Sequence, residues 1–175
     1  MENNNTLKAT TFYAVGLSYK KADAEMRGKF SLDAQAKINL LDQAKKEGIE
    51  ALIVTSTCNR TEIYGFAQHP FQLIKLLCEN SQGTVEEFQQ VAFVYKKQEA
   101  INHMFRVGTG LDSQILGDFE IISQLKMAFT ESKFKNLANA FMERLVNAVI
   151  QASKKIKTET EISSGATSVS FASVQ

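Results

Sequence analysis

The spacing of hydrophobic residues along the chain changes near residue 96. Before it, segments rich in β-branched and aromatic residues alternate with segments of helical spacing. The predicted strands are 11–17, 49–55, 61–67 and 91–95, and the helical segments between them lie at 22–46 and 71–78. The resulting order, β-α-β-β-α-β, is that of the ferredoxin-like split motif.

The segment 22–46 is too long and too interrupted to form one helix. Gly28 predicts a break, and Ser31 is the residue we expect to cap the helix that follows. An apolar side of this helix is formed by Ile38, Leu40 and Leu41. Gly48 then predicts its end, because glycine readily adopts the left-handed conformation found after helices.

The second half contains helical spacing and no convincing strand. Helices are predicted at 98–107, 118–129 and 136–157. In the last of them one buried stripe is predicted, formed by Leu137, Phe141, Leu145, Val149 and Ile156. The sequence therefore predicts an α+β fold, with a ferredoxin-like part (1–96) followed by a helical part (97–160).

The end of the chain has the pattern of a connecting segment. Ser163, Ser164 and Gly165 predict a break, and another helix is expected to begin near Ser168. This helical pattern continues to Gln175 without a capping residue. We therefore expect residues 161–175 to be the start of a linker and the chain to be a fragment of a longer protein.

Composition and charge narrow the function classes. The 175 residues are 44% hydrophobic and 22% charged, as in ordinary globular proteins, and no apolar run is long enough to span a membrane. The N-terminus has no secretory signal and two unlike cysteines suggest no disulfide framework, so a cytoplasmic location is expected. A net charge of +1 argues against non-specific nucleic-acid binding. Local basic clusters at 20–21 and 154–157 could still contact RNA, although a solvated face is the simpler interpretation.

Cys58 lies in the short connector 56–60 between two predicted strands, which favours an antiparallel hairpin. At the tip of such a hairpin a thiol can face a cleft while the sheet fixes its backbone. Arg60 supplies a nearby cation, which favours the thiolate. Taken alone, a single cysteine is more often an inert small hydrophobe. That interpretation suits Cys78, which ends an apolar stretch.

Four segments together resemble one enzyme family. The string STCNRTEIY (56–64) resembles the signature of glutamyl-tRNA reductases, and GLDSQILGDFEIISQLKMAF (110–129) resembles a second block of their N-terminal catalytic domain. The segment 16–30 carries Arg27 where the family typically has an arginine. Residues 158–174 resemble the family's approach to its nucleotide-binding domain.

This resemblance implies an NADPH-dependent oxidoreductase of tetrapyrrole (porphyrin, haem) biosynthesis. In it, the Cys58 thiolate attacks the ester of glutamyl-tRNA, and NADPH reduces the resulting thioester to glutamate-1-semialdehyde. His103 matches a family histidine near the thiol and is expected to act as general acid-base. A domain absent from this chain would bind NADPH, and a missing C-terminal domain would make a homodimer. The aldehyde could pass to a downstream aminomutase.

The same resemblance implies a substrate pocket around the hairpin. Thr57, Asn59 and Arg60 would line it, with Arg60 suited to a bidentate grip on a carboxylate. Glu62 lies on the same strand face as Arg60, and it is either a substrate ligand, an exposed carboxylate or an ion-pair partner of that arginine.

Further substrate contacts are expected from the second half. They are Ser113, beside Asp112, together with Asp118, Glu120 and Ser168. Capping or turn roles explain the two serines and Asp112 equally well from spacing alone. The family usually has Glu and Gln at the positions of Asp118 and Glu120, and commonly His and Pro where Tyr19 and Asp23 stand.

Other functions remain open at this stage. The glycines of 108–110 lack the preceding strand and third glycine of a dinucleotide fingerprint, so no cofactor site is expected in this chain. No metal site is expected either. The alternatives are a thiol-dependent esterase or thioesterase of small substrates, and a non-catalytic RNA-binding module on the sheet.

Overall fold

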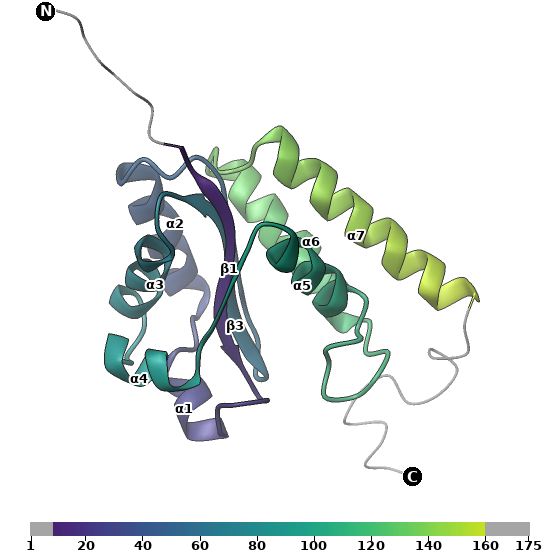
Figure 1. Cartoon of the computed structure of the whole chain (residues 1–175), viewed down its shortest axis with the longest axis horizontal. Coiled ribbons are helices and arrows are strands. Elements are labelled where there is room, and N and C mark those ends of the chain that lie inside the picture. Colours follow the sequence, from purple (N-terminus) through teal and green to yellow (C-terminus); the bar gives the residue numbers. More distant parts are fainter. Residues whose placement is uncertain (1–8, 160–175) are drawn as a thin grey trace, which may run out of the picture.

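The computed structural model describes residues 9–159, and its centre is a four-stranded sheet (Figure 1). The strands are β1 (Thr11–Ser18), β2 (Leu52–Ser56), β3 (Arg60–Ala67) and β4 (Phe93–Lys96). They lie in the order β2-β3-β1-β4, and all neighbours are antiparallel. The predicted α+β class is confirmed, and so is the hairpin between β2 and β3.

Helices cover both faces of the sheet. One face carries α1 (Ala24–Lys29), α2 (Ala34–Lys46), α3 (Pro70–Glu79) and α4 (Val85–Val91) (Figure 1). The other carries α5 (Gln98–Gly108), α6 (Glu120–Phe134) and α7 (Ala140–Glu159). No helix in the described range of 9–159 is long and apolar enough to cross a membrane.

The helices create two separate hydrophobic cores. Because successive strand residues point to opposite faces, β1 contributes Val15 and Leu17 to the core under α2 and α3. It contributes Phe12 and Ala14 to the core under α5, α6 and α7. A sheet buried on both faces holds its register firmly, which fixes the β2–β3 turn in space.

The predicted cap at Ser31 is wrong. Asp23 caps α1 by accepting from the Met26 amide, and Asp33 caps α2 by accepting from the Ala36 amide. A carboxylate also interacts favourably with the positive end of the helix dipole, so Asp33 is the better cap. Gly48, at φ 81°, does follow the end of α2 as predicted.

Several predicted boundaries shift. Strand β2 begins at Leu52 rather than at residue 49, and Val91 belongs to helix α4, which the hydrophobic pattern did not predict. The capping box of Thr84 and Glu87 begins this helix. Helix α6 starts at Glu120, two residues after the predicted start at 118, and continues to Phe134, five residues past the predicted end at 129.

The predicted stripe of the last helix is only partly confirmed. Leu145 and Val149 are buried in the core beneath α7, whereas Phe141 and Ile156 are half-buried. Leu137 is fully buried but precedes α7, which begins at Ala140, and it belongs to the core on the other face.

Candidate functional site

Cys58 is exposed at the turn between β2 and β3, and three hydrogen bonds to side chains hold the backbone of residues 58–60. The Thr57 hydroxyl accepts from the amides of Asn59 (3.2 Å) and Arg60 (3.3 Å). From helix α1, Arg27 Nε donates to the carbonyl oxygen of Cys58 (3.0 Å), while its Nη1 donates to the carbonyl of Ala22 (2.7 Å). The thiol therefore projects from a turn whose position is fixed by its neighbours.

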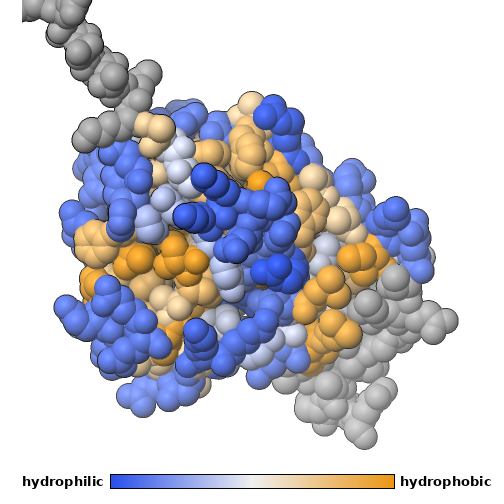
Figure 2. All heavy atoms as spheres, viewed as in Figure 1, coloured by the Kyte–Doolittle hydropathy of each residue, from blue (hydrophilic) through white to orange (hydrophobic). Residues whose placement is uncertain are grey.

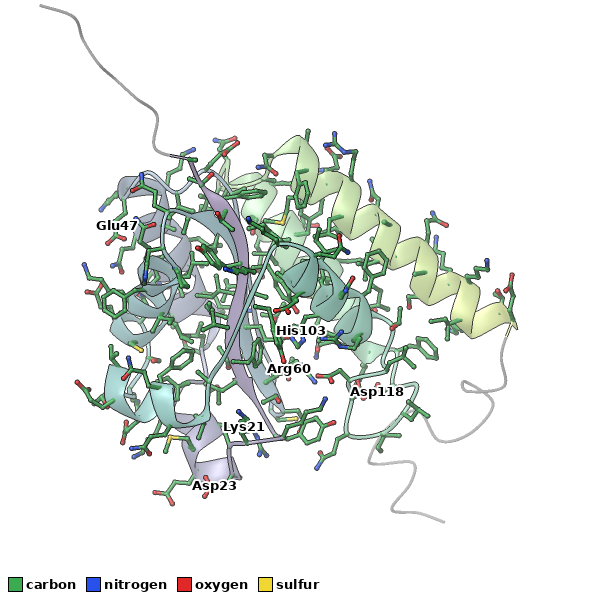
Figure 3. The ribbon with its side chains drawn as sticks, in the orientation of Figure 1. Lys21, Asp23, Glu47, Arg60, His103 and Asp118 are labelled. Atoms are coloured by element: carbon green, nitrogen blue, oxygen red, sulfur yellow. The ribbon has the colours of Figure 1, made fainter. Side chains whose placement is uncertain are left out.

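A cavity of about 300 Å³ opens at this turn, and we call it the Cys58 cavity. It brings together most of the predicted site residues: Thr57, Cys58, Asn59, Arg60, Ser113, Asp118 and Glu120. The first four come from the hairpin, and the others come from the loop between α5 and α6 or from the start of α6. Figure 3 shows Arg60 beside the sheet and Asp118 in the loop after α5, and both residues line this cavity.

Three lining residues were missed by the sequence analysis, namely Gln114, Ile121 and Gln124. Gln124 follows Glu120 by four positions and Ile121 by three on α6, so it shares a helix face with each of them. That spacing was visible in the sequence. What the sequence could not show is that this face turns toward the hairpin.

Arg60 is 3% exposed and lies at the centre of a buried polar network. Its Nη2 donates to the backbone oxygen (2.5 Å) and the carboxylate (3.1 Å) of Asp112, and its Nη1 lies 3.4 Å from Glu62 Oε2. A guanidinium has five N–H donors, so these contacts leave others available for a ligand. Arg60 is thus held in place by two carboxylates while it also lines the Cys58 cavity.

Glu62 is fully buried and serves this network rather than lining the Cys58 cavity. It contacts His103 Nε2 and accepts from the hydroxyl of Tyr64 (3.2 Å). Burial, and then the charge of Glu62, hold the pKa of Tyr64 well above its ordinary value. The ion pair with Arg60, one of the alternatives for Glu62, is present in the structure.

His103 is 4% exposed and lies among aromatic rings, not in the wall of the Cys58 cavity. Its ring centroid is 4.6 Å from that of Phe93 and 5.0 Å from that of Tyr95. It lines a neighbouring cavity instead. Acid-base work by His103 stays a prediction.

Asp112 joins the network to the turn after β1. Lys20 Nζ contacts its carboxylate, and the Tyr19 hydroxyl donates to its backbone oxygen (3.3 Å). Burial raises the pKa of the Asp112 carboxyl, but the hydrogen bond from Lys20 and the charges of Arg60 and Lys20 outweigh burial, so the net pKa lies below its usual value. Asp112 is therefore a structural anion, and Tyr19, a departure from the family pattern, contacts its backbone.

The second cysteine has the inert surroundings predicted for it. Cys78 is half-buried on α3 and packs against the core beneath α2 and α3. Burial raises the pKa of its thiol to about 11, so very little thiolate forms there near neutral pH.

The glycines near residue 108 serve packing and turning. A Cβ added to Gly108 would lie 2.2 Å from Val149 Cγ1, so this glycine lets α5 approach α7. Gly110 has φ +79° and lies against the backbone of Asp118. Neither follows a strand, so these residues do not fit a pyrophosphate cradle.

Two further expectations concern residues or sites away from the cavity. Within residues 9–159 no group of three or more His, Cys, Asp or Glu side chains could hold a metal ion. Ser168 lies outside the described residues.

Fold and site together define a class: an α+β domain that presents one exposed thiol to a polar cavity. Residues 15–160 match the family described as the N-terminal domain of glutamyl-tRNA(Glu) reductase. This chain belongs to that family.

Individual relatives agree with this assignment. The chain is 82% identical over its whole length to the glutamyl-tRNA reductase of Flavobacterium psychrophilum, of which it covers 42%. It is 37% identical, over 94% of its length, to that of Pseudoalteromonas atlantica, of which it covers 40%. A solved structure of glutamyl-tRNA reductase from Methanopyrus kandleri matches 93% of the chain and 38% of its own length, with 26% identity and a TM-score of 0.75. The chain thus spans about two fifths of the relatives that it matches.

Proposed function

We propose that this chain performs the acyl-transfer step of glutamyl-tRNA reduction. The Cys58 thiolate attacks the carbonyl carbon of the ester that joins glutamate to the tRNA. A carbon–sulfur bond forms, the carbon–oxygen ester bond breaks, and the ribose oxygen leaves with a proton. The observation that carries this proposal is the exposed Cys58 thiol at a polar cavity, in a chain of this family.

The charges of the Cys58 cavity suit a glutamyl group. Such a group carries a carboxylate on its side chain and an ammonium on its α-carbon. Arg60 offers its remaining N–H donors to the carboxylate, and its ion pairs hold the guanidinium in place before substrate arrives. Asp118 and Glu120, on the α6 side, supply negative charge for the ammonium. The replacement of the family's Glu and Gln by these two acids keeps an acid at the first position and adds one at the second.

We retain Thr57, Asn59 and Ser113 as polar contacts to the substrate, since all three line the Cys58 cavity. Glu62 and His103 lie behind Arg60 in the buried network, so we propose that Glu62 acts by orienting Arg60. For His103 we keep the role of general acid toward the ribose oxygen. A His103→Gln variant that binds tRNA normally but transfers glutamate slowly would support that role.

Reduction needs residues beyond those described. NADPH would supply the hydride in the complete enzyme, and the glycines at 108 and 110, which do not follow a strand, do not fit a dinucleotide. We therefore propose that the NADPH site, the homodimer contact and the hand-over to an aminomutase belong to other parts of the longer protein. The division into a ferredoxin-like part (1–96), a helical part (97–160) and a linker (161–175) belongs to the same proposal.

The direct test is to trap the acyl group. The protein is mixed with tRNA carrying isotopically labelled glutamate, quenched in acid and digested, and the labelled peptide is identified by mass spectrometry. Label is expected on the peptide containing Cys58, absent from Cys58→Ala, and unchanged in the matched control Cys78→Ala. Competition by uncharged tRNA separates this function from a plain thiol esterase, which would not respond to the RNA.

A further inference from the structure

A second, smaller cavity of about 130 Å³ lies beside the Arg60 network, and we call it the basic cavity. Its basic residues come from two distant segments. Lys20 and Lys21 belong to the turn after β1, and Arg106 belongs to α5. Figure 3 places Lys21 and His103 at the same end of the sheet, and both line this cavity.

Two of these three cations have no partner in the described part of the protein. Lys20 contacts the Asp112 carboxylate, but the side chains of Lys21 and Arg106 form neither a hydrogen bond nor an ion pair there. Asp112 is the one acidic residue among those lining the cavity, and Lys20 and Arg60 already neutralise it. The cavity therefore presents uncompensated positive charge, in a chain whose net charge is only +1.

The remaining walls are aromatic and polar. The rings of Phe93, Tyr95 and His103 line one part, and Ser18 and the apolar Val91 complete the lining. Phe93 stacks on Tyr95, with ring centroids 5.1 Å apart. Sites for drug-sized ligands usually have several hundred Å³, so about 130 Å³ suits a small anion such as a phosphate group rather than a whole nucleotide. On the face seen in Figure 2, hydrophilic residues gather over the region where β4 leads into α5.

The basic cavity and the Cys58 cavity are linked by the ion pair of Arg60 and Asp112, since Arg60 lines the Cys58 cavity and Asp112 lines the basic cavity. Asp112 lines the first and its neighbour Ser113 lines the second. Ser18, in the first, is paired across the sheet with Arg60, in the second. An anion in the basic cavity would therefore lie close to a substrate whose ester reaches Cys58.

We propose that the basic cavity binds a backbone phosphate of the RNA whose ester reacts at Cys58. This inference rests on the proposed acyl-transfer function, because that function brings a polyanion to this end of the sheet. Lys21 and Arg106 contact the phosphate oxygens, and the network next to them keeps Arg60 and Asp112 in place. A free phosphate ion offers the same chemistry, so the experiment separates the two sources.

The experiment measures binding of uncharged tRNA(Glu), which requires no reaction at Cys58. The double variant Lys21→Gln/Arg106→Gln is compared with the matched control Lys46→Gln/Arg144→Gln, which removes one lysine and one arginine from exposed positions on α2 and α7. Affinity is measured over a series of salt concentrations. Melting temperature is recorded for both variants, and it should not change because all four side chains are exposed.

The cavity variant is expected to bind RNA about tenfold more weakly, and the slope of log K against log salt should become shallower by about 0.7 to 1. The control should keep the slope of the unaltered protein. Equal losses in both variants would overturn the proposal, because they would show general attraction and no site.

Inorganic phosphate identifies the source of the ligand. The cavity variant could bind RNA as well as the unaltered protein does but no longer bind inorganic phosphate. That result would overturn the proposal and identify free phosphate, not RNA, as the ligand. If the cavity variant kept both RNA binding and inorganic phosphate binding, the basic cavity would not be an anion site at all. If the unaltered protein bound no tRNA at all, the proposed acyl-transfer function would fail before the cavity was in question.

Discussion

Replacement of Arg60 by methionine tests the buried network that shapes the Cys58 cavity. Methionine keeps much of the side-chain length but removes the guanidinium, which lies between the carboxylates of Glu62 and Asp112. Those side chains are 0% and 7% exposed, so water cannot replace the lost partner. Removing one member of a buried ion pair costs about 3–5 kcal/mol, since a charge stays buried without compensation.

The contacts that Glu62 and Asp112 keep place the expected loss of stability at the lower end of this range. Glu62 keeps Tyr64 and His103, and Asp112 keeps Lys20. We therefore expect a loss of about 3 kcal/mol, which for a chain of this size lowers the melting temperature by about 6–12 °C. Thermal unfolding followed by circular dichroism measures it.

Two companion variants sharpen the result. Arg144→Met, at an exposed position of α7, removes the same group and should change stability by less than about 0.5 kcal/mol. Adding Asp112→Asn to Arg60→Met should cost less than the sum of the two single changes, because one unpaired charge disappears. If Arg60→Met and Arg144→Met had the same melting temperature within error, the stabilising role of the buried network would be refuted. The claim that this network orients Arg60 before substrate binds would fail with it.

Three other predictions follow from contacts around the thiol. Arg27→Met removes the hydrogen bonds to the backbone oxygens of Cys58 and Ala22, so we expect a loss of about 1 kcal/mol in stability and a slower glutamyl transfer with little change in tRNA affinity; equal transfer rates would contradict the positioning role. Folding lowers the pKa of Asp112, so its contribution to stability is present above the unfolded value near 3.8 and is lost as pH falls through the folded pKa. The free energy of unfolding should therefore fall less steeply with pH below about pH 4 in Asp112→Asn than in the unaltered protein. Iodoacetamide at pH 8 should alkylate the exposed Cys58 rapidly and Cys78 hardly at all, because burial raises the pKa of the Cys78 thiol to about 11; comparable labelling of both in the native protein would contradict the assigned burial.

Local patterns predicted the sheet and the hairpin because both depend on period-two hydrophobicity and a short connector. Helix α4 escaped prediction, since a helix of this length has little periodicity, although its capping box was visible at Thr84. The cap of α2 was misplaced from Asp33 to Ser31 because both residue types are good caps and only the backbone geometry decides between them.

The sequence predicted the part of the candidate site that comes from one continuous segment. It did not predict the contacts between segments that are far apart in the chain. Arg60 and Thr57 belong to the hairpin, so their place beside Cys58 followed from chain position. The position of Asp112, 52 residues away from Arg60, follows from how α5 packs on the sheet, and spacing alone cannot show it. The same reason explains why Gln124 was missed and why the basic cavity was not foreseen from Lys20 and Lys21.

Stoichiometric acylation is the most direct test of the central claim. Labelled glutamate supplied on tRNA, in the absence of NADPH, should accumulate to about one glutamyl group per chain, held as a hydroxylamine-sensitive thioester on Cys58. Label that stays on the RNA, or that appears undiminished when Cys58 is alanine, would contradict the account.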